Sequence, residues 1–173
     1  MPDTHLEAIA RKSGASAAGL IALILATSFA GAAVYILVAE QPARLALADS
    51  ALLRHWQESY PRAARMQAGL AVLASLVGAF AFWRARSPLW LVGAALMLAN
   101  LPFTLIVIAP VNNALTALGT DQAGAASRAL IERWGSLHAV RAGLSVLATA
   151  AFALAIARAR LTRRCGNRAR PCP

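Results

Sequence analysis

Charged residues are scarce in this sequence. Asp, Glu, Lys and Arg make up 14% of the 173 residues, while hydrophobic residues make up 59%. This composition is too apolar for an ordinary soluble domain, and it excludes acidic tails and disordered polymers. Only two cysteines are present, which excludes a disulfide scaffold. The chain is therefore expected to form one small membrane domain.

The common catalytic sequence motifs are also missing. The chain contains no Walker loop, dinucleotide-binding fingerprint, His-Glu-x-x-His, nucleophile elbow or Cys-x-x-Cys pair. If the protein has an active site, its residues must come together from separate parts of the chain.

Stretches without charge indicate where the membrane lies. Four intervals lack Asp, Glu, Lys and Arg: residues 13–39, 66–83, 87–120 and 142–157. A helix needs about 20 apolar residues to cross the hydrocarbon core, and the second and fourth intervals fall slightly short. Their helices must extend past a charge, which places Arg62 and Arg65, and likewise His138 and Arg141, at or just inside the membrane boundary.

We therefore predict an all-α fold, a bundle of four transmembrane helices with two longer outer loops, in a single domain of residues 1–158. The predicted spans are about 15–39, 66–83, 89–109 and 138–157. Short amphipathic helices are expected near residues 45–58 and 123–137. Residues 159–173 are expected to form a disordered, basic, cytoplasmic tail.

The basic residues predict an orientation. Ten of the 17 Lys and Arg residues lie in the N-terminal segment, the turn at residues 84–88 and the tail. The positive-inside rule then places both termini in the cytoplasm, in the inner (plasma) membrane of the cell. The net charge of +10 is concentrated beside the spans, so the expected partner is the lipid bilayer and not nucleic acid. Cys165 and Cys172 lack the spacing of a zinc motif.

The two outer loops carry most of the polar residues that could do chemistry. Trp134, His138 and Arg141 recur at i, i+4 and i+7, so they share one helical face and could line a pocket. From these residues alone, the favoured interpretation is an interfacial tryptophan, a boundary histidine and a snorkelling arginine. By default, Glu40 is a carboxylate at the membrane edge that is either solvated or paired with Arg44, four residues on.

Two further interpretations stay open at this point. Pro102 frees a backbone carbonyl, so Asn100 and Thr104 flank either a cavity or a simple kink. Glu40, His55 and His138 could bind a non-haem metal, but no local motif supports this.

A faint internal repeat pairs Trp56 and Tyr60 in the first half with Trp134 and His138 in the second.

Several short patterns carry a resemblance to a known family. They are Glu40-x-Pro42-Ala43-Arg44, Trp56-x-x-x-Tyr60, Pro102-Phe103-Thr104, Pro110-x-Asn112 and Trp134-x-x-x-His138-x-x-Arg141. With these residues the chain resembles, from about residue 15 to 158, the anthrone-oxygenase-like family of small four-span membrane proteins. It looks most like the bacterial branch, whose members mostly lack an assigned role. Fungal members oxidise anthrones to anthraquinones without a metal or flavin, and often have Asn where His138 stands.

The resemblance implies a cofactor-independent oxygenase or related oxidoreductase that acts on an apolar aromatic molecule. His138 or Glu40 would abstract a proton, and Arg141 and Arg44 would stabilise the developing oxyanion. Residues expected to bind the substrate are Trp56, Tyr60, Asn100, Thr104, Asn112 and Trp134.

The alternative is a non-catalytic membrane subunit or scaffold. Glu40 would then form a structural ion pair with Arg44 or Arg141, and the spans would pack against a partner. An enclosed cavity at the outer ends of the helices would favour the enzyme, whereas a filled interior would favour the subunit. Oligomeric state is not predicted.

Overall fold

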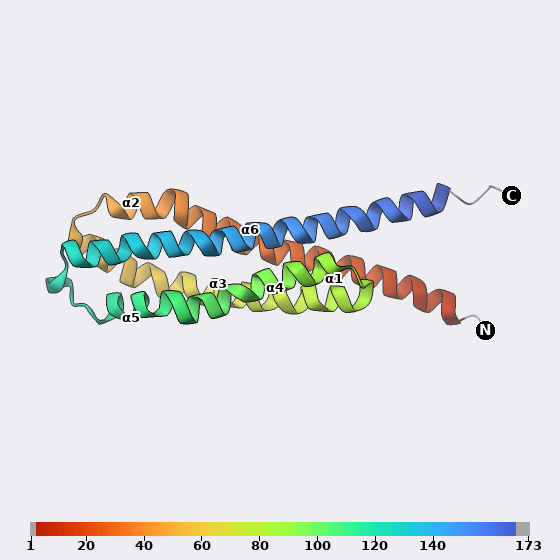
Figure 1. Ribbon diagram of the computed structural model, residues 1–173, viewed down its shortest axis with the longest axis horizontal. Helices are drawn as coiled ribbons and strands as arrows, with labels where there is room; N and C mark the ends of the chain where they lie inside the picture. The colour runs from red at the N-terminus through yellow and green to blue at the C-terminus, as the bar shows by residue number, and fades with distance from the viewer. Residues whose placement is uncertain (1–2, 169–173) are drawn as a thin grey trace.

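The computed structural model describes residues 3–168, and the side chains of residues 17–162 (Figure 1). Every regular element in this part of the chain is helical. The long elements are α1 (Asp3–Tyr35), α3 (Asp49–Ala85), α4 (Pro88–Phe103) and α6 (Ala125–Arg168). The shorter ones are η1 (Ile36–Glu40), α2 (Gln41–Leu45), η2 (Thr104–Ile108), α5 (Ala109–Ala117) and η3 (Thr120–Gln122).

These elements join into four helical rods that are long and apolar enough to cross a membrane. The rods are Ala17–Leu45, Asp49–Ala85, Pro88–Ala117 and Ala125–Thr162. The start of α1, the α3–α4 turn and the end of α6 lie at one end of the bundle, and the two longer connections lie at the other (Figure 1). The protein is therefore a multi-pass, all-α, four-helix membrane protein, as the charge-free intervals predict.

The helices are longer than the predicted spans. The expected amphipathic helices near 45–58 and 123–137 are not separate elements, since they form the first parts of α3 and α6. At about 1.5 Å per residue, the 37 residues of α3 extend about 55 Å, well beyond a hydrocarbon core of about 30 Å. A charged side chain limits contact with lipid but does not end a helix.

The predicted boundary at residue 158 also differs from the structure. Helix α6 continues through residues 159–168, where disorder was expected, and residues 169–173 lie outside the described part. The continuation has a local reason, because Ala, Leu and Arg after residue 158 favour helix and no glycine occurs before Gly166.

Two prolines explain the π-helical segments. Pro42 and Pro110 lack the backbone N–H that would bond to the carbonyl four residues back. One residue separates each of these prolines from the π segment before it. The preceding N–H bonds five residues back in both cases: Gln41 to the Ile36 carbonyl, and Ala109 to the Thr104 carbonyl. Each π segment, η1 in the first rod and η2 in the third, therefore lies directly before a turn of helix that contains a proline.

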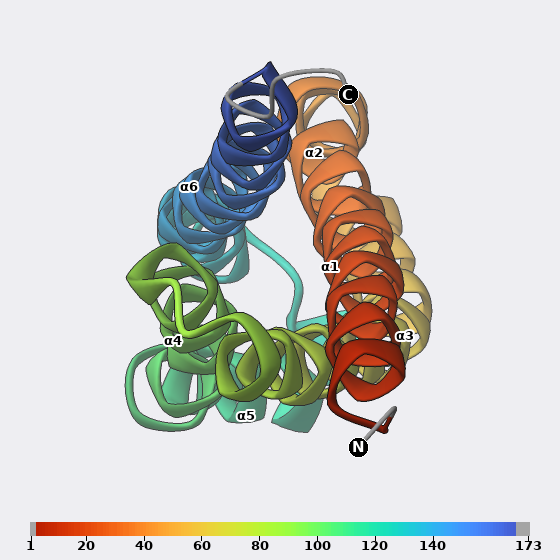
Figure 2. The ribbon, with the colours of Figure 1, turned by 90° about the vertical axis from the view of Figure 1, so that its right-hand side faces the viewer.

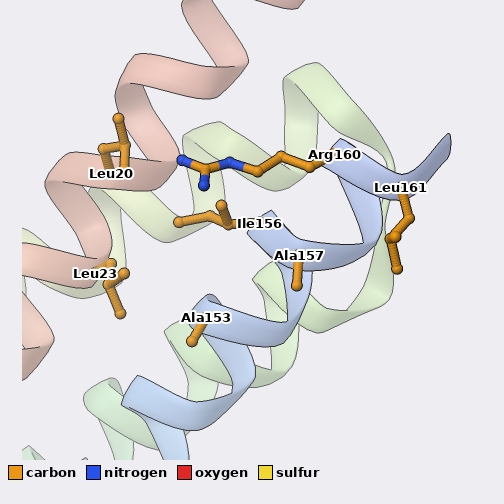
Figure 3. Close-up of a pocket in the computed structure, with 7 residues that line it drawn as sticks. All are labelled: Leu20, Leu23, Ala153, Ile156, Ala157, Arg160 and Leu161. Atoms are coloured by element: carbon orange, nitrogen blue, oxygen red, sulfur yellow. The ribbon is translucent and has the colours of Figure 1, made fainter. Parts of the chain in front are cut away.

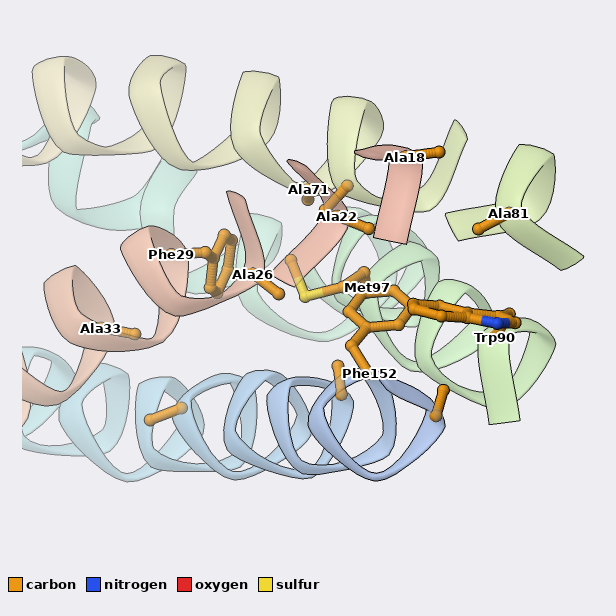
Figure 4. Packing of buried hydrophobic residues seen from close by; sticks show 14 residues of the cluster. Ala18, Ala22, Ala26, Phe29, Ala33, Ala71, Ala81, Trp90, Met97 and Phe152 are labelled. Atoms are coloured by element: carbon orange, nitrogen blue, oxygen red, sulfur yellow. The ribbon is translucent and has the colours of Figure 1, made fainter. Parts of the chain in front are cut away.

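Small side chains let the four rods pack closely around a shared core. Viewed along the bundle, α1, α3, α4 and α6 follow one another in a ring (Figure 2). Helix α1 contributes buried alanines, among them Ala18, Ala22 and Ala26, and the larger residues Trp90, Met97 and Phe152 fill the interior (Figure 4). A second apolar cluster surrounds Trp56 near the end with the long connections.

Replacing Gly93 by Ala is expected to lower the free energy of unfolding by about 1–3 kcal/mol, the usual effect of overpacking a core. A β-carbon there would meet three atoms of the Phe152 ring at less than 3.0 Å. The control is Gly143→Ala on α6, where a β-carbon meets nothing within 4 Å. Thermal unfolding of both variants in detergent measures the difference, and equal midpoints would contradict the packing argument.

Candidate functional site

A small polar cavity lies where η1, α2, α3 and α6 meet, near the end of the bundle with the long connections. It contains about 10 Å³ of space, which is room for about one water molecule. Its lining residues are Ile36, Glu40, Arg44, Ser59, Tyr60, Ala63, Ala64, Gln67, Trp134, His138 and Arg141. Glu40, Arg44, His138 and Arg141, the four predicted catalytic residues, therefore meet in one place.

An ion pair occupies one side of the cavity. The Arg44 guanidinium donates a hydrogen bond to the Glu40 carboxylate, four residues earlier on the same rod. Arg44 is 2% exposed, and its guanidinium lies 5.5 Å from the centre of the Trp134 ring. Spacing alone predicts this pair, and the structure confirms it. The carboxylate of Glu40 is engaged by Arg44, so it is less suited than His138 to act as a base.

Two stacked ring pairs lie on another side of the cavity, and the internal repeat noted in the sequence supplies both; Tyr60, Trp134 and His138 line the cavity, and Trp56 packs behind them. Trp56 stacks on Tyr60 with ring centres 4.7 Å apart, and Trp134 stacks on His138 at 5.0 Å. Trp134 stands nearly perpendicular to Trp56 and to Tyr60. Asn112 joins this arrangement by donating from Nδ2 to the Tyr60 hydroxyl oxygen at 2.6 Å.

The orientation of His138 fixes which of its nitrogens can act as a base. His138 is 1% exposed, and its Nε2 lies 3.2 Å from the Ala33 carbonyl oxygen. A carbonyl only accepts hydrogen bonds, so Nε2 must carry the proton and Nδ1 holds the lone pair of the neutral ring. Within the described residues Nδ1 has no hydrogen-bond partner. It is the atom of this site best prepared to accept a proton.

Arg141 is held by a residue that the sequence did not single out. The Arg141 guanidinium donates to Oε1 of Gln67 at 2.9 Å and lies 5.4 Å from the centre of the Phe29 ring. Gln67 is 1% exposed. A glutamine inside the otherwise apolar interval 66–83, seven residues after Tyr60 on the same helical face, was the available signal.

Some predicted site residues lie elsewhere. Asn100 donates to the Leu96 and Met97 carbonyls, and the Thr104 hydroxyl donates to the Asn100 carbonyl at 2.7 Å. These bonds stay within their own rod, on either side of Pro102, and neither residue lines the cavity. The prediction that Asn100 and Thr104 bind substrate thus gains no support from their position.

The metal alternative also finds no ligand set. Among the described residues, no three side chains of His, Cys, Asp and Glu come close enough together to hold a metal ion. His55 is exposed on α3, whereas His138 is buried. Glu40, His55 and His138 therefore do not form a joint site.

A larger groove at the other end of the bundle has little chemistry to offer. It contains about 470 Å³ and lies between α1 and α6 (Figure 3). Leucine, isoleucine and alanine side chains line it, and Arg160 extends across it towards Leu20 (Figure 3). With one guanidinium and no acid, base or nucleophile, it is not a candidate active site.

The fold and the cavity together define a class: a four-span membrane protein with a buried site of two arginines, a histidine and a carboxylate. Residues 56–151, more than half of the chain, match the sequence profile of the anthrone oxygenase family. The chain is also 31% identical over 130 residues to the anthrone oxygenase tpcL of Aspergillus fumigatus, a match that covers 69% of this chain and 81% of that protein. The chain belongs to the anthrone oxygenase family. No solved structure matches it significantly.

The region matched by the family contains most of the cavity. Tyr60, Gln67, Trp134, His138 and Arg141 lie within residues 56–151, whereas Glu40 and Arg44 precede it. The family resemblance inferred from short patterns is thus confirmed, and His138 and one of the two buried arginines, Arg141, fall inside the matched region.

Proposed function

We propose that this protein is a cofactor-independent oxygenase that acts on an apolar aromatic molecule dissolved in the membrane. The observation that carries the proposal is His138, whose protonated Nε2 is held by Ala33 and whose Nδ1 is left without a partner beside two buried guanidinium groups. A base and nearby cations are what the oxidation of a weakly acidic ring carbon requires.

The reaction balances without an external reductant. A CH₂ carbon of the substrate, such as the one in an anthrone, loses a proton to Nδ1 of His138 through one water in the cavity, which leaves a resonance-stabilised carbanion. Dioxygen forms one bond to that carbon, and the peroxide anion takes a proton back from the imidazolium. Loss of the second C–H proton with cleavage of the O–O bond gives a ketone and water. The sum is CH₂ + O₂ → C=O + H₂O.

In the proposed enzyme, the small size of the cavity keeps the rings of the substrate outside it. Pockets for drug-sized molecules are about 300–1,000 Å³, so a fused-ring substrate does not fit into about 10 Å³. Tyr60, Ala63 and Ala64 line the cavity and are partly exposed, which places a mouth beside α3. The ring system would approach there, with Trp56, Tyr60, Asn112 and Trp134 forming or supporting the aromatic wall.

Oxygen uptake by the purified protein tests this proposal. With an anthrone in detergent micelles, we expect one O₂ consumed per ketone formed, at a rate that rises with protein concentration. Protein-free micelles provide the background of spontaneous oxidation. A rate no higher than that background, from protein whose helical circular dichroism shows it to be folded, would overturn the proposal.

A second candidate function, a non-catalytic membrane subunit, is favoured by two specific observations. The polar cavity has room for only about one water, and Glu40 and Arg44 form the ion pair expected of a structural role. In that case replacing Glu40 would reduce the amount of folded protein, and no substrate would be consumed.

We also propose that both termini face the cytoplasm, in the plasma membrane. Support comes from the arginines at the α3–α4 turn and at the end of α6, on the same side of the bundle as the start of α1. A membrane-impermeant maleimide added to intact cells should leave Cys165 and Cys172 unlabelled. It should label a cysteine introduced at the exposed Ala126 in a variant with both native cysteines changed to serine. The reverse pattern would contradict the orientation.

A further inference from the structure

The charges buried around the polar cavity do not balance. Arg44 and Arg141 are 2% and 6% exposed, and the single carboxylate lining the cavity, Glu40, is bonded to Arg44. Among the described residues no carboxylate lies within ion-pair distance of Arg141, which contacts Gln67 and the Phe29 ring. A buried cation without an anionic partner is strongly unfavourable, so this site favours an additional negative charge.

The buried polar atoms of the lining residues that have no hydrogen-bond partner also favour an anion. Within the described residues, the buried nitrogens without a partner include Nε and Nη1 of Arg44, Nε of Arg141, Nε1 of Trp134 and Nε2 of Gln67. All are donors, and all belong to residues that line the cavity. Among the same unpartnered atoms of the described lining residues, Nδ1 of His138 is the acceptor. Water needs acceptors as well as donors, whereas an anion uses donors alone.

We propose that the polar cavity is a binding site for a small monoanion of one to three atoms. Space for about one water excludes sulfate, phosphate and larger oxyanions. The charge of Arg141 supplies the attraction, and the indole N–H of Trp134 and the amide of Gln67 supply neutral donors.

This site also deepens the proposed function, and that step rests on it. When the substrate carbanion transfers one electron to dioxygen, the products are a substrate radical and superoxide, which then combine to form the C–O bond. Superoxide is a diatomic monoanion, so it belongs to the class that the cavity would hold. The buried arginines would lower the energy of the electron transfer by stabilising superoxide, while the aromatic ring stays at the mouth.

Azide and chloride are suitable probes, because both are small monoanions that do not support the reaction. Purified protein in detergent is titrated with each salt at constant ionic strength, with gluconate as the replaced anion, and followed by calorimetry and thermal unfolding. We expect saturable binding that raises the unfolding midpoint. Sulfate should give no saturable response. During anthrone oxidation, azide should compete with dioxygen.

Matched variants locate the binding. Arg141→Gln should weaken azide binding at least tenfold, whereas Arg54→Gln, at an exposed position on α3, should leave it unchanged. If Arg141→Gln fails to fold, Gln67→Leu replaces it and should weaken binding severalfold, because it releases the Arg141 side chain.

The outcomes separate this inference from the proposed function. Azide binding without anthrone turnover would leave the anion site standing and remove the oxygenase. Turnover without saturable azide binding, or binding unchanged by the Arg141 and Gln67 variants, would overturn the anion site alone. An ultraviolet tyrosinate signal that disappears in Tyr60→Phe would overturn it too, since Tyr60 would then be the counter-ion of Arg141.

Discussion

Replacing His138 by Gln is expected to lower the turnover of an anthrone at least about 100-fold, with little change in KM. A positioned general base typically contributes a factor of about 10²–10⁴ to a rate. Gln was chosen because its side-chain amide can still donate a hydrogen bond to the Ala33 carbonyl, so the helix contact survives while the proton acceptor at Nδ1 is lost. Steady-state oxygen uptake measures kcat and KM together.

The control for this substitution is His55→Gln. His55 is an exposed histidine on α3 that does not line the cavity, so its replacement should leave kcat unchanged. If His138→Gln turns over at the wild-type rate, His138 is not the base, and the argument from its orientation fails. If both variants lose activity equally, the loss is not specific to the cavity.

The fold was predictable because lipid imposes a simple rule on the sequence. Helices that cross the hydrocarbon core carry few charges, so the four charge-free intervals predicted four helical rods that are long and apolar enough to cross a membrane. The same rule said nothing about where helices end. Arg54, Arg62 and Arg65 lie within α3, because arginine favours helix and its long side chain lets the charged group reach away from an apolar layer.

Half of the candidate site could be predicted from spacing alone. Trp134, His138 and Arg141 share one helical face, and Trp56 and Tyr60 share another, so their grouping within a helix follows from the periodicity. Which faces meet depends on how α3 and α6 are rotated against each other, and a single sequence does not give this. Gln67 was missed for that reason.

Asn100 and Thr104 show a different limit of reasoning from sequence. A polar residue beside a proline in an apolar span signals an unsatisfied carbonyl, but it does not say whether the partner is a ligand or the helix itself. Here Asn100 and Thr104 both bond within their own rod, to the Leu96, Met97 and Asn100 carbonyls, and none of these is the carbonyl that Pro102 deprives of its donor. The backbone adjusts further along, through the π segment η2 before Pro110.

Replacing Glu40 by Ala is expected to lower the free energy of unfolding by about 3 kcal/mol, the lower end of the range for breaking a buried ion pair. The Arg44 side chain is 1% exposed and that of Glu40 is 21% exposed, so the variant leaves a buried guanidinium without its carboxylate. Unfolding of the purified protein, followed by circular dichroism, measures the change. Glu132→Ala, at an exposed position on α6, should have almost no effect.

The double variant Glu40→Ala with Arg44→Met separates the ion pair from simple loss of packing. Removing both charges leaves no buried ion unpaired, so the double variant should be more stable than Glu40→Ala alone. A double variant as unstable as the sum of the two single variants would contradict the pairing.

Turnover then distinguishes the two candidate functions. If Glu40 only holds Arg44 in place, Glu40→Ala should keep part of the wild-type turnover per folded molecule, whereas a non-catalytic subunit would show no turnover in either protein.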